Sequence, residues 1–172
     1  KKDELIFEEK SKAFTVSINL SSDEKYYFIT TSDHNTSEQY YFNVNENQPK
    51  PKLIKKRKKS ILYSVNSWNK KFYNHTNENA EDFKIDITES LTNQNWKKFI
   101  PPRDEVLISG CIFLKNWIIR SETSNAIAKL FVKNIETNLE EELIFSDEKI
   151  CVPGVSLIQR DKNTNEVYLS YS

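Results

Sequence analysis

A chain of 172 residues has room for one domain of ordinary size, and its 25 Lys and Arg residues are balanced by 25 Asp and Glu residues. Zero net charge argues against a dedicated nucleic-acid or anionic-membrane binder, because such proteins usually carry a basic excess. Aromatic residues make up 12% of the chain and can bury enough surface for a core, which excludes wholesale disorder.

One phrase, a polar turn followed by an apolar strand, occurs four times along the chain. Its copies lie at residues 23–30, 69–76, 115–121 and 165–170. The steps between them are 46, 45 and 50 residues, measured through Lys25, Lys71, Asn116 and Glu166. A repeat of this length indicates that the chain is built from similar structural units.

Other apolar segments keep the same step around each copy. Strands before the phrase are predicted at 14–18, 61–65 and 111–114. Strands after the phrase are predicted at 38–42, 82–86 and 129–133. Strands that close a unit are predicted at 5–8, 53–56, 96–99 and 143–146. These segments are rich in Tyr, Phe, Ile, Val and Thr, and polar turns bound them. Each unit is therefore predicted to hold four short strands.

Four antiparallel strands in ~40–50 residues are typical of one β-propeller blade. The alternative is an all-β sandwich, which gives no reason for four element types to keep one register. The predicted fold class is all-β: a partial β-propeller of about three and a half blades of four antiparallel strands, with residues 1–172 as a single segment of that domain. Since propellers close with about four to eight blades, we expect a piece of a larger ring that exposes apolar faces and self-associates in isolation.

The phrases also predict which side chains are equivalent between blades. Phe28, Phe72, Ile118 and Tyr168 are predicted to occupy comparable strand positions in successive units. Propeller strands alternate faces, so this register would decide which residues meet between neighbouring blades.

Several segments resemble the propeller of oligopeptidase B and of prolyl oligopeptidases generally. Residues 3–9, with Phe14 and Ser37-Glu38, resemble one blade of oligopeptidase B, and Arg57, Tyr63, Phe72-Tyr73 and Thr76-Asn77 resemble the next. Residues 114–120, 130–132, 144–145 and 171–172 resemble the last propeller stretch of the wider family. The chain departs from the family at residues 124–126, where Ser-Asn-Ala stands in place of the usual Gly-Leu, and in having two glycines.

The resemblance implies a two-domain serine peptidase in which a seven-bladed propeller caps an α/β-hydrolase domain. Such an enzyme cleaves oligopeptides after Lys or Arg, and the propeller keeps folded proteins out. The implied partners are the C-terminal hydrolase domain, the remaining blades and oligopeptide substrates. The catalytic triad of the family would lie beyond Ser172, so this segment is expected to hold no catalytic residue. A standalone or degenerate propeller that binds other proteins is the alternative.

Few residues offer chemistry of their own. Gly110 and Gly154 are too few for a phosphate loop or a dinucleotide fingerprint, and no cofactor or metal motif is present. His34 in a polar turn and His75 at a strand end are interpreted as structural. Cys111 and Cys151 lie in apolar contexts and are interpreted as buried thiols without a lowered pKa.

Charge clusters are interpreted as surface features. Paired carboxylates at Glu8-Glu9, Glu81-Asp82 and 140–142 are expected to face solvent rather than perform acid–base catalysis. The basic run at 50–59 resembles a nucleic-acid patch, but it has no interleaved aromatic residue and contains a predicted edge strand, where lysines discourage aggregation. With no run of ~18 apolar residues and no signal peptide, we expect a cytoplasmic protein that binds neither nucleic acid nor membrane.

Overall fold

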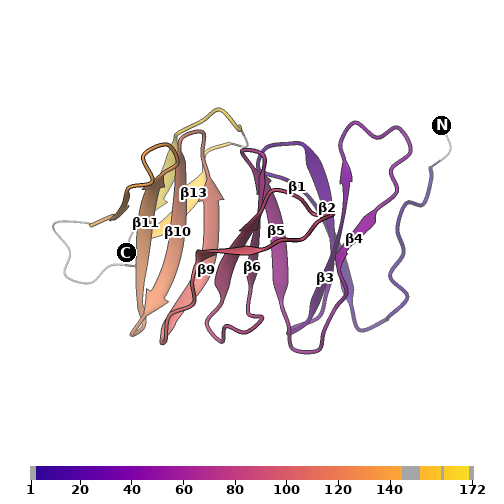
Figure 1. Ribbon diagram of the computed structural model, residues 1–172, viewed down its shortest axis with the longest axis horizontal. Coiled ribbons are helices and arrows are strands. Elements are labelled where there is room, and N and C mark those ends of the chain that lie inside the picture. Colours follow the sequence, from indigo (N-terminus) through magenta and orange to yellow (C-terminus); the bar gives the residue numbers. More distant parts are fainter. Residues whose placement is uncertain (1–2, 145–151, 160, 171–172) are drawn as a thin grey trace. The chain divides into compact units, whose positions relative to one another are not determined.

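The computed structural model describes residues 3–144, 152–159 and 161–170, and this part of the chain is all β-strand and loop, without a helix. Three four-stranded antiparallel sheets are followed by a two-stranded one (Figure 1). Sheet 1 is β1 (Thr15–Leu20), β2 (Tyr26–Ser32), β3 (Ser37–Asn43) and β4 (Lys52–Lys55). Sheet 2 is β5 (Tyr63–Trp68), β6 (Lys71–Thr76), β7 (Lys84–Thr88) and β8 (Lys97–Ile100). Sheet 3 is β9 (Val106–Phe113), β10 (Trp117–Ser124), β11 (Ile127–Asn134) and β12 (Glu140–Glu142), and sheet 4 is β13 (Gly154–Leu157) and β14 (Val167–Ser170).

This arrangement confirms the all-β, partial-propeller fold class: each complete sheet has its strands side by side in sequence order. Two predicted closing strands differ from the structure. Residues 5–8 are coil, because they run past sheet 1 without backbone pairing to it. The closing strand of sheet 3 is Glu140–Glu142 rather than 143–146, because β11 pairs with the acidic segment; Phe145 and Ser146 lie outside the described residues.

The chain divides into two compact units, Lys1–Pro101 and Pro102–Ser172. Unit 1 contains sheets 1 and 2, which pack face to face. Alternation of side chains along each strand supplies one apolar face per sheet. The cluster between the sheets consists of buried Phe28, Ile54, Tyr63, Val65, Phe72 and Leu91, with Tyr26, Tyr41 and Trp96 at its margin.

The four residues predicted to be equivalent all lie on the second strand of their sheets, β2, β6, β10 and β14, which confirms the strand assignment. Their faces do not match, however. Phe28 and Phe72 meet in the same cluster, so Phe28 points toward sheet 2 and Phe72 points back toward sheet 1. In unit 2, Ile119 and Val167 pack in the core, which places neighbouring Ile118 and Tyr168 on the opposite faces of their strands. An alignment of two strands that is off by one residue assigns every side chain to the wrong face.

Hydrogen bonds from buried polar side chains join sheets 1 and 2 beside the apolar cluster. The Ser37 hydroxyl accepts from the Tyr63 amide at 2.7 Å, and the Tyr63 hydroxyl accepts from the Gln39 amide at 2.8 Å. At the other end of the strands, the Ser67 hydroxyl donates to the Asp23 carboxylate at 2.8 Å. Buried polar groups need such partners, so these bonds specify how the two sheets are aligned.

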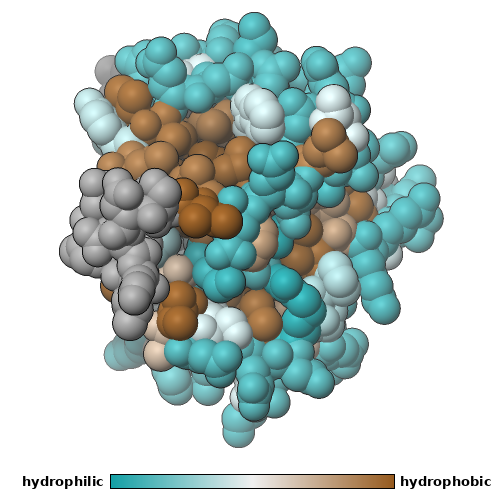
Figure 2. Space-filling view, turned by 90° about the vertical axis from the view of Figure 1, so that its left-hand side faces the viewer, coloured by the Kyte–Doolittle hydropathy of each residue, from teal (hydrophilic) through white to brown (hydrophobic). Residues whose placement is uncertain are grey.

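Unit 2 packs sheet 4 on one face of sheet 3. Its core consists of Leu114, Ile119 and Leu130, with Ile112, Trp117, Val132, Leu143, Val155 and Val167 packed around them. Gly110 lies next to the register shift between β9 and β10, where its φ of 145° belongs to a region that residues with a Cβ rarely adopt. Figure 2 shows apolar surface among hydrophilic residues, and Leu139 and Tyr168 are 68% and 61% exposed.

The turns use few glycines. Ten non-glycine residues of the described part have positive φ: Glu24, Ser60, Asn69, Lys70, Asn79, Phe83, Glu105, Asn125, Ala126 and Asn138. Asn tolerates this left-handed conformation better than most residues, whereas Lys70, Phe83 and Ala126 adopt it at a cost. The described part also contains no helix of the length and hydrophobicity that a membrane span requires.

Candidate functional site

The predicted histidines lie near one end of unit 1. His34 is exposed in the β2–β3 turn, and His75 on β6 stacks on Phe83, with ring centroids 4.6 Å apart. Ser64 on β5 is the direct register partner of His75. Both line a shallow cavity of about 220 Å³, together with Thr30, Ser32, Asp33, Ser37, Leu62, Tyr63 and Phe83. The sequence did not reveal this pairing, because two residues eleven positions apart become neighbours only through the strand register.

A hydroxyl, an imidazole and a carboxylate therefore line one cavity, but the Asp33 carboxylate forms its hydrogen bonds within the β2–β3 turn. Its Oδ1 accepts hydrogen bonds from the amides of Asn35 at 2.9 Å and Thr36 at 2.7 Å. These bonds lower the pKa of Asp33 and stabilise its charged form. A catalytic triad needs its carboxylate to orient the imidazole, so this cavity is a poor hydrolytic site.

Cys111 on β9 is half-buried, and burial raises the pKa of its thiol to about 12. A thiol that stays protonated near neutral pH is a weak nucleophile, so the interpretation of Cys111 as a structural residue remains a prediction. Cys151 lies outside the described residues. Within those residues, no group of three or more His, Cys, Asp or Glu side chains could hold a metal ion.

The basic run contains β4, which is an edge strand of sheet 1, as the sequence predicted. Lys55 forms an ion pair with Glu78, and Arg57 forms ion pairs with Glu9 and Glu38. The run is thus partly neutralised by acidic residues from other segments, which disfavours it as a nucleic-acid surface.

The residues that carry the family resemblance meet where the chain passes from sheet 1 to sheet 2. The Leu62 amide donates to Asn77 Oδ1 at 2.8 Å, and the Thr76 hydroxyl donates to the Leu62 carbonyl at 2.8 Å. Next to them, the Tyr63 hydroxyl donates to the Lys55 carbonyl. These side chains fix the connection between two neighbouring sheets, which is a structural rather than a chemical role.

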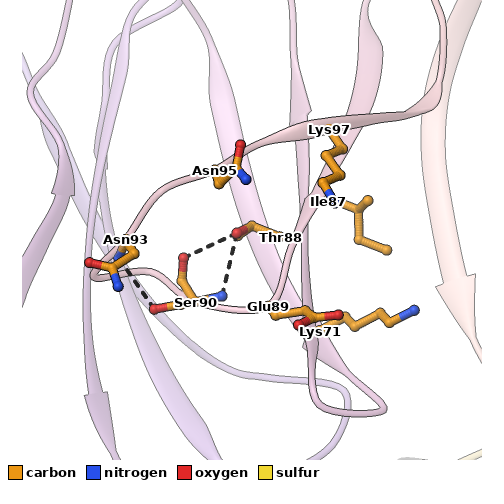
Figure 3. Close-up of a pocket in the computed structure, with 8 residues that line it drawn as sticks. All are labelled: Lys71, Ile87, Thr88, Glu89, Ser90, Asn93, Asn95 and Lys97. Atoms are coloured by element: carbon orange, nitrogen blue, oxygen red, sulfur yellow. Dashed lines mark hydrogen bonds between the residues drawn. The ribbon is translucent and has the colours of Figure 1, made fainter.

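The end of sheet 2 holds a second cavity, of about 400 Å³, which Figure 3 shows. Its lining residues are Lys71, Ile87, Thr88, Glu89, Ser90, Asn93, Asn95 and Lys97. The Ser90 hydroxyl accepts from the amides of Thr92 at 3.2 Å and Asn93 at 3.3 Å, which orders the β7–β8 loop. Hydroxyl, amide, ammonium and carboxylate groups line this cavity, and the Thr88 and Ser90 hydroxyls form hydrogen bonds with backbone groups of the loop.

Unit 2 has an apolar cavity of about 460 Å³ on the sheet 3 face that carries sheet 4. It is lined by Trp117, Val132, Asn134, Thr137, Leu139, Glu141, Glu142 and Leu143. Val132 and Leu143 also contact the core around Leu130. Among the described residues, the two strands of sheet 4 thus leave part of the apolar face of sheet 3 uncovered.

Carboxylates paired with Arg57 make the stability of unit 1 sensitive to acid. Burial opposes ionisation of Glu38, but the Arg57 amide, the Tyr40 hydroxyl and the Arg57 guanidinium together lower its pKa. The Ser11 amide and Arg57 lower the pKa of Glu9. A lowered pKa stabilises the fold above the unfolded pKa of about 4.3, and this stabilisation is lost as pH falls through the folded value.

We therefore expect the urea concentration at the unfolding midpoint of unit 1 to decrease when the pH is lowered from 7 to 3.5. Glu38→Gln should lower the midpoint at pH 7 and shrink the difference between the two pH values. The measurement is urea unfolding followed by tryptophan fluorescence, with Glu8→Gln as the control because Glu8 is exposed. An equal pH difference in Glu38→Gln and wild type would contradict this assignment.

Comparison with known proteins identifies the family. The profile described as "Prolyl oligopeptidase, N-terminal beta-propeller domain" matches residues 1–172. This chain belongs to that family. Its sheets are therefore blades of a β-propeller, and the resemblance in the sequence is confirmed.

Curated relatives are much longer than this chain. Protease 2 of Moraxella lacunata is 28% identical over 98% of this chain and 24% of its own length. Dipeptidyl aminopeptidase BI of Pseudoxanthomonas mexicana is 24% identical over 99% of this chain and 23% of its own length. The chain thus spans about a quarter of the length of these relatives.

Solved structures agree with the propeller fold. Oligopeptidase B from Trypanosoma brucei, with covalently bound antipain, has a TM-score of 0.87 at 20% identity, over 97% of this chain and 25% of that one. Oligopeptidase B from Leishmania major has a TM-score of 0.84 at 14% identity, with the same coverage. At these identities the likeness concerns the fold alone.

Proposed function

We propose that this chain is a propeller segment of an oligopeptidase B-like serine peptidase, where it gates access of oligopeptides to a hydrolase domain. The observation that carries the proposal is the family match over all 172 residues, in relatives about four times as long. The sheets would form part of the propeller that restricts access to the active site, and catalysis would come from the C-terminal domain.

The proposed partners are that hydrolase domain, the remaining blades of a seven-bladed ring and oligopeptide substrates cleaved after Lys or Arg, in the cytoplasm. The open apolar face of sheet 3 is consistent with further strands of the same protein covering it. An enclosed site reached through a propeller would accept short flexible peptides and exclude folded proteins, which are too large to enter.

The test is to express the complete protein that its gene encodes and to assay it with fluorogenic peptides. We expect cleavage after Arg and Lys, little cleavage of the matched peptide with norleucine at that position, and none of a folded protein. Cleavage of folded proteins would contradict gating, and equal cleavage after norleucine would contradict the specificity. A gene product without a hydrolase domain would overturn the proposal in favour of a standalone binding module.

The 172-residue chain by itself is expected to hydrolyse no peptide. Asp33 is held by its own turn, and the pKa of Cys111 is too high for a thiolate. Incubation with an Arg-containing fluorogenic peptide should give the signal of the blank. Turnover that Ser64→Ala or His75→Ala abolishes would contradict this expectation and identify the 220 Å³ cavity as a catalytic site.

A further inference from the structure

The basic run at residues 50–59 forms an edge of sheet 1 rather than one of its faces. It contains seven Lys and Arg residues and no Asp or Glu. Its strand β4 pairs with β3 on one side and, in the described part of the chain, with no strand on the other (Figure 1). Blades of a propeller cover one another's faces, and the last strand of a blade lies on the outside of the ring. This surface therefore stays accessible when neighbouring blades are in place.

The protein itself neutralises part of this positive charge. Lys55 pairs with Glu78, and Arg57 pairs with Glu9 and Glu38. The other five cations are exposed and form no ion pair with the described residues: Lys50, Lys52, Lys56, Lys58 and Lys59. We call these five residues the lysine edge. Its ammonium groups are free to bind the carboxylates of another molecule.

The contacts of Glu78 show how this surface stabilises a carboxylate. A hydrogen bond from Lys55 lowers the pKa of Glu78, and the charges of Lys55, Lys58 and Lys84 lower it further. Lys84 also pairs with Asp86, at 2.9 Å. Three ammonium groups thus stabilise one carboxylate, and Lys58 remains available to a second one.

The residue types favour an acidic protein segment over a nucleic acid. Arginine binds phosphate through its planar fork, but the one arginine of the run, Arg57, already donates to Glu38 and Glu9. The run has no aromatic residue on which a base could stack. Leu53, by contrast, is 44% exposed among the lysines and offers an apolar contact to a peptide side chain.

We propose that the lysine edge is a docking surface for an extended acidic segment of another protein. Carboxylates of that segment bind Lys56, Lys58 and Lys59, and its less polar side chains contact Leu53. The same lysines repel other basic edges, so the surface discourages pairing with copies of itself and selects an acidic partner. This docking is separate from the cleavage of peptides and does not require it.

The first test measures, by fluorescence anisotropy, how a labelled peptide of alternating Glu and Thr residues, as long as the run, binds the intact protein. The variant Lys56→Gln/Lys58→Gln/Lys59→Gln should bind the peptide about tenfold more weakly than wild type. The control variant has the same loss of charge at exposed lysines elsewhere in unit 1, Lys12→Gln, Lys25→Gln and Lys71→Gln. It should bind within about twofold of wild type, and a salt concentration of about 1 M should release the peptide from both.

The second test increases the free positive charge at the lysine edge. Glu78→Gln releases Lys55 and Lys58 and should tighten peptide binding about threefold. Glu89→Gln makes the same change of charge at an exposed glutamate outside the run and should leave binding near that of wild type. Unchanged binding in Glu78→Gln, equal losses in the two triple variants, or no binding to wild type would each overturn the docking surface. An oligothymidylate of equal charge that binds as tightly as the peptide would overturn the acidic protein segment in favour of a nucleic acid.

Discussion

Phe28→Ala is expected to destabilise unit 1 by about 3–5 kcal/mol, the cost of removing a large aromatic side chain from a packed core. Phe28 is 3% exposed in the cluster where sheets 1 and 2 meet, and its ring lies 6.4 Å from that of Tyr26. Both sheets contribute to this cluster, so the cavity left by alanine cannot be closed by a shift of one side chain alone.

The measurement is urea unfolding of the intact protein, followed by the fluorescence of Trp68 and Trp96 in unit 1. Tyr168→Ala is the control, because Tyr168 is an aromatic residue that is 61% exposed in unit 2. We expect the control to change stability by less than about 1 kcal/mol. Similar losses in both variants would mean that the interface between sheets 1 and 2 is not the principal core of unit 1.

Arg120→Met should cost unit 2 about 3 kcal/mol, because it removes the buried guanidinium that pairs with the buried Glu122 carboxylate and with Glu140. The Arg120 guanidinium donates to Glu122 at 2.6 Å and to both carboxylate oxygens of Glu140, at 2.6 and 3.1 Å. It also lies 4.6 Å from the centroid of the Phe131 ring. Through these contacts it connects β10, β11 and β12 on one face of sheet 3.

Lys129→Met is a matched control, since Lys129 also pairs with a glutamate of β12, Glu142. The Lys129 side chain is 39% exposed, against 5% for Arg120, so its ion pair should contribute less than about 1 kcal/mol. The urea midpoints of the two variants, read from Trp117, give the comparison. Equal losses would contradict the importance of burial for this cluster.

The strands were predictable because apolar alternation and polar turns are local signals. Predicted strands overlap twelve of the fourteen observed ones. No strand was predicted at β13, and β12 was placed a few residues late because its Glu-Glu-Glu sequence has no apolar residue. Side-chain faces were harder. An alignment that is off by one residue exchanges the two faces of a strand, and Phe28 and Phe72 point in opposite directions.

Contacts between residues far apart in the chain could not be predicted from the sequence, for a different reason. Ser37, Gln39 and Ser67 are buried although polar, because each finds a partner on the neighbouring sheet. A hydrophobic pattern assigns such residues to the surface. The pairing of Glu9 with Arg57 joins residues 48 positions apart, which no local rule predicts.

The scarcity of glycine in the turns offers a practical route to a more robust protein. Lys70, Phe83 and Ala126 each hold a left-handed backbone conformation that disfavours a side chain by about 1–2 kcal/mol. Glycine at Lys70 or Ala126 would relieve this strain at exposed positions, with some of the gain offset by the greater freedom of the unfolded chain. Crystallisation or expression trials could therefore begin at these hairpin tips, where sequence can change without disturbing the blades.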